Sequence, residues 1–95
     1  MKENLILELT FAFALDVIST AKTLRKKSEF ELASQLWRSG TSIGANVEEA
    51  QAAQSRADFR SKISIAAKEA RETHYWLRLA QEAKILPNSE THILL

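Results

Sequence analysis

Hydrophobic residues recur along this chain at helical spacing, and no segment alternates apolar and polar residues as a strand does. A wide apolar sector runs through about Asn4–Lys26, and apolar positions three and four apart share one face over about Ser28–Gln54. The clearest helical pattern covers about Ser55–Ala83. The spacings therefore predict three helices.

Polar residues at the edges of these patterns mark the helix ends. Ser28 and Ser55 are the expected N-caps of the second and third helices, and Asp58 suits the positive end of the third helix dipole. Pro87 closes the following turn, and Asn88 or Ser89 caps a fourth helix of which only a few residues are present. The prediction is an all-α fold, an antiparallel up-and-down four-helix bundle whose fourth helix is short or truncated.

The first helix carries more apolar surface than one seam needs. We expect its core seam to consist of Leu7, Phe11, Ala14, Leu15, Ile18 and Ala21. Leu9, Phe13 and Val17 lie outside that seam and extend the apolar surface. This excess favours a second contact, which another subunit would supply.

The third helix divides into three faces at about 100° per residue. The expected core stripe contains Phe59, Ile63, Ala66, Ala70, Thr73, His74 and Leu77. The opposite stripe contains Arg60, Ser64, Lys68, Arg71, Tyr75 and Arg78. The sector between them contains Ile65, Glu69, Glu72, Trp76 and Leu79. Since a large aromatic residue among aliphatics and carboxylates is common at interfaces, we predict an oligomer interface at Trp76, Ile65 and Leu79. The alternative is that Trp76 wraps onto its own core edge.

The basic stripe has two interpretations. Its cations suit phosphate contacts and Tyr75 suits stacking on a base, which makes Arg60, Lys68, Arg71, Tyr75 and Arg78 the candidate nucleic-acid site. The alternative is a solvated face on which Lys68 pairs with Glu72. Secondary candidates close the first helix, where positive charge also complements the helix dipole: Lys22, Arg25, Lys26 and Lys27.

Composition limits the class of protein. The chain has 95 residues, 45% of them hydrophobic, which predicts a single domain over 1–95 with a small core. Its 13 Lys and Arg against 12 Asp and Glu leave a net charge of +1, so a nucleic-acid site would have to be a local patch. The chain has no cysteine, which suits the cytoplasm. We also expect no signal peptide and no membrane segment, because Glu8 and Asp16 interrupt the longest apolar stretch.

Catalytic and metal-binding patterns are missing from the sequence. His74 and His92 are far apart, no Glu-x-x-His pair occurs, and the serines have no adjacent base. The glycines are not followed by Lys-Ser or Lys-Thr, so no phosphate-binding loop is predicted. We therefore expect no enzyme, catalytic residue, metal, cofactor or small-molecule substrate.

Both glycines of the chain, Gly40 and Gly44, lie within the second helical pattern. Four residues apart on a continuous helix, they share one face and allow another backbone to come close, while a local break in the helix is the alternative. Asn46 and Glu48 are polar neighbours of this helix-packing motif. We expect Asn46 to bond across a helix crossing and Glu48 to pair with a cation on a neighbouring helix.

The run RSGTSIGANVEEA, followed by SRADFRSKISIAAKEARETHYWLRLA, resembles the four-helix-bundle proteins encoded in intervening sequences of bacterial 23S rRNA genes. The resemblance covers about Leu5 to Leu86. Ala50 stands where many members have glycine, and the segment after Pro87 is shorter than the family's fourth helix. The resemblance implies a homo-oligomer, since relatives form ring-like homopentamers. It also implies nucleic-acid binding, since a related accessory protein of diversity-generating retroelements binds nucleic acid through basic surface. It implies no catalytic residue.

Two functional hypotheses from different classes follow. The first is a non-enzymatic oligomeric bundle that binds RNA or DNA through the basic stripe. The second is an oligomeric scaffold or protein-interaction module, which the near-neutral net charge favours. Nucleic-acid binding that weakens as the salt concentration rises would favour the first hypothesis, and no such binding would favour the second.

Overall fold

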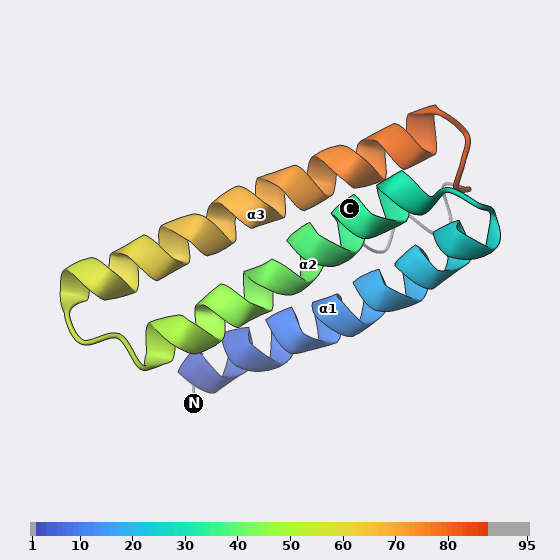
Figure 1. Ribbon diagram of the computed structural model, residues 1–95. Helices are drawn as coiled ribbons and strands as arrows, with labels where there is room; N and C mark the ends of the chain where they lie inside the picture. The colour runs from blue at the N-terminus through green and yellow to red at the C-terminus, as the bar shows by residue number, and fades with distance from the viewer. Residues whose placement is uncertain (1, 88–95) are drawn as a thin grey trace.

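The computed structural model describes residues 2–87, with side chains from residue 5 onward, as three helices (Figure 1). Helix α1 spans Lys2–Lys26, α2 spans Phe30–Gln51 and α3 spans Arg56–Glu82. Two short connections reverse the chain, so that α2 runs back along α1 and α3 runs back along α2 (Figure 1). The all-α prediction is confirmed for these residues. The predicted fourth helix falls on residues 88–95, outside the described part of the chain.

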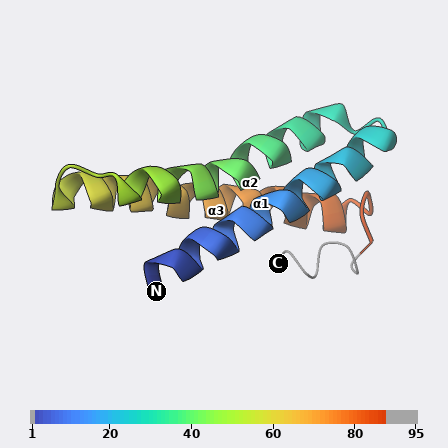
Figure 2. The ribbon, with the colours of Figure 1, turned by 90° about the horizontal axis from the view of Figure 1, so that it is seen from below.

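Helix α2 is the central element and packs against both of its neighbours. Figure 1 shows it between α1 and α3, and Figure 2 shows it bending near its middle. Leu36 of α2, Leu24 of α1 and Leu77 of α3 are almost completely buried together. The remaining buried members of this core cluster are Val17, Ala21, Ala33, Ala80 and Leu86. Each helix thus contributes aliphatic side chains to one core, and burial of those side chains stabilises the fold.

The core side of α1 differs from the predicted seam. Val17 and Ala21 are fully buried, whereas Phe11 is 63% exposed and Leu15 is 54% exposed. The prediction that Phe11 and Leu15 face the core is therefore wrong, and Val17, expected on the excess surface, is central. Although α1 keeps this exposed apolar surface, no helix within residues 2–87 is long and apolar enough to cross a membrane.

The helix ends follow local rules. Ser55 is the N-cap of α3, and its side chain accepts a hydrogen bond from the Asp58 backbone N–H at 3.0 Å, as predicted. The predicted cap at Ser28 is wrong, because Ser28 has a left-handed φ of 63° and ends α1 instead. Lys84 ends α3 in the same way, with a φ of 60°. In both turns a backbone N–H reaches back five residues, from Glu29 to the Leu24 carbonyl and from Ile85 to the Ala80 carbonyl.

Candidate nucleic-acid interface

The basic stripe of α3 lies on the outer side of the helix. All five candidate residues are exposed: Arg60, Lys68, Arg71, Tyr75 and Arg78. With a rise of 1.5 Å per residue, Arg60 and Arg78 are about 27 Å apart along the axis. Arg60, Arg71 and Arg78 differ by about 20° around the helix, so they project in nearly one direction. The stripe is a straight line of positive charge about as long as eight base pairs of a duplex.

The cations of this stripe are not used in ion pairs within the described part of the chain. The ion pairs there involve two other cations, Arg38 of α2 and Lys62 of α3. The Lys62 ammonium lies 3.4 Å from the Glu49 carboxylate on α2. The predicted alternative, in which Lys68 pairs with Glu72, does not occur, because the Glu72 carboxylate contacts Arg38 instead. The stripe is therefore free to contact an external anion.

Tyr75 is the one aromatic residue in the stripe, and 53% of it is exposed. Its ring meets the Trp76 ring edge to face, with centroids 5.2 Å apart and planes at 66°. This contact leaves about half of Tyr75 open to solvent. Such a ring suits stacking on a base beside phosphate-binding cations.

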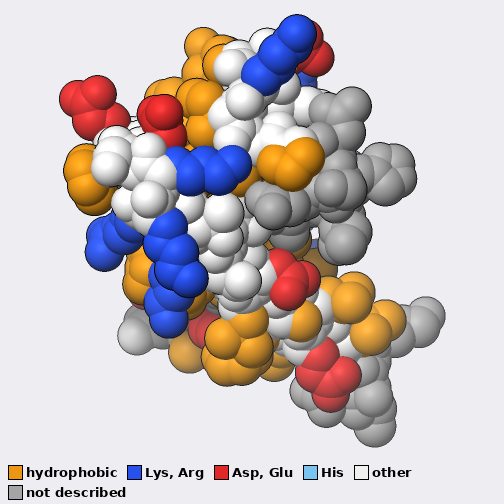
Figure 3. Space-filling model, turned by 90° about the vertical axis from the view of Figure 1, so that its right-hand side faces the viewer, with side chains coloured by type: hydrophobic (Ala, Val, Ile, Leu, Met, Phe, Trp, Pro, Cys, Tyr) orange, Lys and Arg blue, Asp and Glu red, His pale blue; other side chains and the backbone are white. Residues whose placement is uncertain are grey.

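The cations at the end of α1 divide into two kinds. The Arg25 guanidinium lies 5.5 Å from the ring centroid of Trp37, and the Lys27 ammonium donates a hydrogen bond of 2.7 Å to the Ile85 carbonyl. These contacts stabilise the turn and the core edge. Lys22 and Lys26 are exposed. Figure 3, which looks onto one end of the molecule, shows Lys and Arg side chains as separate protrusions with acidic and hydrophobic side chains between them.

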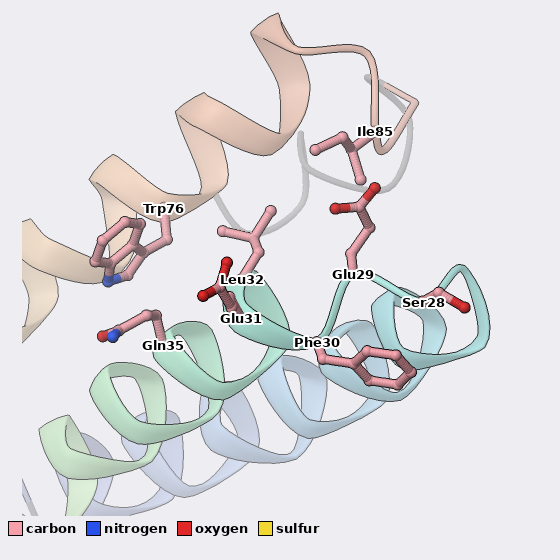
Figure 4. Close-up of a pocket in the computed structure, with 8 residues that line it drawn as sticks. All are labelled: Ser28, Glu29, Phe30, Glu31, Leu32, Gln35, Trp76 and Ile85. Atoms are coloured by element: carbon pink, nitrogen blue, oxygen red, sulfur yellow. The ribbon is translucent and has the colours of Figure 1, made fainter.

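Trp76 packs against the edge of its own core rather than standing free. It is half-buried beside the core cluster, and its indole N–H donates a hydrogen bond of 3.2 Å to the Glu72 carboxylate. In Figure 4, Trp76 of α3 lies above Gln35 of α2, with Leu32 between the two helices. The alternative of a core-edge tryptophan thus describes its contacts within one chain. Ile65 and Leu79, its predicted partners in an interface, remain 38% and 40% exposed.

The hollow drawn in Figure 4 lies where α2 begins and α3 ends. Glu29 points toward Ile85 across it, and Glu31 and Gln35 add further polar side chains. Within the described part of the chain the Ser28 hydroxyl, which also lines it, makes no hydrogen bond to a carboxylate, and no three His, Asp or Glu side chains are grouped to hold a metal ion.

An ion-pair network joins α2 to α3 and was not anticipated from the sequence. The Arg38 guanidinium lies 3.3 Å from the Glu69 carboxylate and also contacts the Glu72 carboxylate, which accepts the Trp76 hydrogen bond. The sequence pattern places Glu69 and Glu72 in the sector that carries Trp76, and the one partner it suggests for either acid is Lys68 for Glu72. Both carboxylates therefore pair with Arg38 of α2 and not with the cations of the basic stripe.

Gly40 and Gly44 lie where α2 crosses α1. A Cβ atom at Gly40 would lie 2.5 Å and 2.7 Å from the two γ-methyl carbons of Val17. A Cβ atom at Gly44 would lie 3.3 Å from the Thr10 carbonyl oxygen. The helix continues through both glycines, so the local break considered as an alternative does not occur. The missing side chains allow the two backbones to approach closely.

The polar neighbours of the glycines behave differently from the expectation. The Asn46 amide donates to the Ser42 carbonyl within α2, at 2.8 Å, rather than across the crossing. Glu48 is exposed and forms no ion pair with the described residues, whereas its neighbour Glu49 pairs with Lys62. The buried polar contact between α2 and α3 lies elsewhere, where the Ser39 and Thr73 hydroxyl oxygens are 2.9 Å apart.

An apolar groove separates α1 from α3 on the side that α2 leaves open. Its larger part is a hollow of about 460 Å³ floored by Ile43 and walled by Leu9, Phe13, Ala70 and Leu77. A smaller hollow of about 220 Å³ extends it past Ile6, Val47, Ile63, Ala66 and Ala67. His74, expected in the core stripe, is exposed and lines this groove. The three described helices therefore leave one long apolar side uncovered.

Comparisons with known proteins agree with the predicted resemblance. The sequence model of a family described as 23S rRNA-intervening sequence protein matches residues 2–95. The chain is similar to a crystal structure of a protein with unknown function from the S23 ribosomal protein family of Bacteroides thetaiotaomicron. The two are 41% identical, with a TM-score of 0.94 over 99% of this chain and 85% of the other. A search of curated proteins gave no match.

Proposed function

Because the chain belongs to the family of 23S rRNA-intervening sequence proteins, we propose that it is a non-enzymatic, oligomeric helical-bundle protein that binds RNA or DNA through the basic stripe of α3. One observation carries the proposal: four exposed cations and an exposed tyrosine form one line, which the exposed Glu82 ends one turn after Arg78, while Glu69 and Glu72 pair with Arg38 of α2. Cations on one helix face contact phosphates without reading sequence. The affinity should therefore depend on the charge and shape of the nucleic acid and little on its sequence.

The two sets of basic residues contribute unequally in this proposal. The stripe residues Arg60, Lys68, Arg71 and Arg78 contact phosphates, and Tyr75 stacks on a base. Lys22, Arg25 and Lys26 lie on α1 and Lys27 lies in the turn after it, so they are on a different helix from the basic stripe. They serve a second, weaker contact, since Arg25 and Lys27 already make internal contacts.

The proposed oligomer is a ring-like homopentamer, as the resemblance implies. Exposed apolar side chains on α3 support assembly, because Ile65 is 38% exposed and Leu79 is 40% exposed. In a ring, the Trp76, Ile65 and Leu79 sector of α3 would contact the next copy. Light scattering measures this directly, since a pentamer has five times the 10.7 kDa mass of the chain.

The proposed bundle has four helices, with the apolar groove between α1 and α3 covered by a fourth helix antiparallel to α3. The groove supports this arrangement because Leu9, Phe13, Ile43 and Leu77 present apolar side chains on all three of its sides. A helix with an apolar stripe buries such a surface well.

The test is fluorescence anisotropy with a labelled structured RNA and with a labelled DNA duplex at several salt concentrations. Arg71→Glu should weaken binding at low salt at least tenfold. Lys62→Glu, with the same change of charge on the opposite flank of α3, should weaken it much less. Equal effects of the two changes would contradict the assigned site. No binding by the wild-type oligomer at low salt would favour the scaffold hypothesis.

A further inference from the structure

One line of residues on α1 combines charge and apolar surface in a fixed order. Glu8, Phe11, Leu15, Ile18 and Lys22 follow one another at steps of three and four residues, so they share one side of the helix. We call this line the α1 outer stripe. All of its members are exposed except Ile18, which is half-buried. The stripe has an acid at one end, an apolar centre and a cation at the other end.

The stripe borders a hollow that is separate from the groove between α1 and α3. This hollow of about 340 Å³ lies between α1 and α2 and is lined by Phe11, Leu15 and Ile18. On the α2 side, Gly44 and Ala45 line it. Because these two residues have little or no side chain, the α2 wall stays low and another helix can approach α1 closely.

Charge along this surface is separated by sign. Gly44 lies against Thr10, and Glu48 is one turn further along α2, so Glu48 is at the same end of the hollow as Glu8. Lys22 is about 21 Å from Glu8 along the α1 axis. Within the described part of the chain, Glu8, Glu48 and Lys22 form no ion pairs with other residues. Each charge is therefore available to a group outside the chain.

We propose that the α1 outer stripe is a two-fold contact with a second copy of this chain, in which the two α1 helices pack antiparallel about Leu15. Glu8 and Lys22 are each seven residues from Leu15. An antiparallel pair centred on Leu15 therefore places Glu8 beside Lys22 of the partner subunit, and the symmetry repeats this pair. Phe11 then packs near Ile18 of the partner subunit, as apolar positions do in antiparallel helix pairs.

This contact is additional to a ring. A two-fold contact uses the same surface on both copies and cannot by itself close a ring of five, so it joins two single copies or one copy from each of two rings. It rests on the homo-oligomer part of the proposed function and not on nucleic-acid binding. Lys22 also belongs to the proposed second nucleic-acid contact, so the two-fold contact is measured by cross-linking without RNA, and either proposal can fail alone.

The first experiment uses the absence of cysteine from the chain. A single Leu15→Cys substitution places both sulfurs at the two-fold axis, and mild oxidation should produce a covalent dimer in most of the protein. Lys26→Cys is the control, since eleven residues from the axis it would lie about 33 Å from its copy, beyond disulfide reach. Equal cross-linking of the two variants would overturn the proposal.

The second experiment tests the register in the Leu15→Cys background. Glu8→Lys alone and Lys22→Glu alone place like charges together and should each reduce the dimer yield several-fold. An equimolar mixture of these two single variants should restore the yield as a mixed dimer, because every charge pair is then opposite in sign. Circular dichroism checks that each variant is folded. Unchanged yield in the single variants, or no mixed dimer, would contradict the antiparallel pairing.

Discussion

Replacing Gly40 with alanine should destabilise the protein, although alanine is the better helix former. The new Cβ atom would lie 2.5 Å from one γ-methyl carbon of Val17 and 2.7 Å from the other. Val17 has no exposed surface and belongs to the core cluster. Because its branched side chain has few rotamers and no free space, α1 and α2 must move apart or Val17 must adopt a strained conformation.

The size of the effect follows from two opposing terms. Overpacking a core by one methyl group costs about 1–3 kcal/mol. Replacing glycine with alanine inside a helix contributes about 0.5–1 kcal/mol of stability. Because two contacts with Val17 would be shorter than 3.0 Å, the overpacking cost lies in the upper part of its range, about 2–3 kcal/mol. The expected net loss in the free energy of unfolding for Gly40→Ala is therefore about 1–2.5 kcal/mol, a large fraction of a typical total of about 5–15 kcal/mol.

Urea and thermal unfolding followed by circular dichroism at one protein concentration measure this loss. The expected decrease in Tm is about 4–8 °C for each kcal/mol in a domain of this size. Gly44→Ala is the matched control, because its Cβ atom would lie 3.3 Å from the Thr10 carbonyl oxygen and needs a smaller adjustment. For Gly44→Ala the cost of the closer contact and the gain in helix stability should nearly cancel, so the free energy of unfolding should change little.

A double-mutant cycle identifies the contact responsible. Val17→Ala alone should destabilise by leaving a cavity, but it makes room for the new methyl group of Gly40→Ala. The two changes together should cost at least about 1 kcal/mol less than the sum of the single changes. The reasoning would be refuted if Gly40→Ala were as stable as the wild type, or if the two changes were additive.

Four further predictions concern stability and are checked by the same unfolding measurements. Thr73→Val should cost about 1–3 kcal/mol, because it leaves the buried Ser39 hydroxyl without its partner at 2.9 Å. Ser39→Ala should cost less, since the Thr73 hydroxyl still donates a hydrogen bond to the Glu69 carbonyl. Arg38→Ala should cost less than about 1 kcal/mol, since half of that side chain is exposed. Leu24→Ala should cost about 2–5 kcal/mol because Leu24 is fully buried. Lys84→Gly should raise stability by up to about 1 kcal/mol by relieving the left-handed φ of 60°.

Local sequence signals were sufficient where the structure depends on neighbouring residues. The cap at Ser55 was predicted correctly, since a serine three residues before an acid at the start of an apolar pattern needs no distant partner. Ser28 was assigned to the wrong helix end. A serine in the left-handed conformation ends α1 there, and the sequence contains no glycine to mark this turn.

The core side of α1 could not be chosen from the sequence alone. Apolar residues cover so much of this helix that Leu15 and Val17 were both reasonable core positions. The choice depends on α2, because Gly40 provides the space that Val17 fills. The spacing of the two glycines is therefore enough to predict a helix crossing. Which residue of α1 faces Gly40 depends on how α1 and α2 are aligned along their axes, and the sequence does not specify this alignment.

The contacts of the acids on α3 were missed for the same reason. Arg38 is 31 residues from Glu69 and 34 from Glu72, so only the packing of α2 on α3 brings them together. The basic stripe was easier to identify, because exposed residues on one helix share a face whatever the tertiary structure. Its five candidate residues are all exposed in the structure.

The most direct test of the central claim is the salt dependence of RNA binding by the wild type and by Arg71→Ala. Four phosphate-contacting cations predict a slope of log K against log salt of about −3 for each bound copy, and removal of one should make the slope shallower by about 0.7–0.9. The account predicts this decrease together with weaker binding at every salt concentration. An unchanged slope and affinity for Arg71→Ala would contradict the claim that the basic stripe of α3 contacts phosphates.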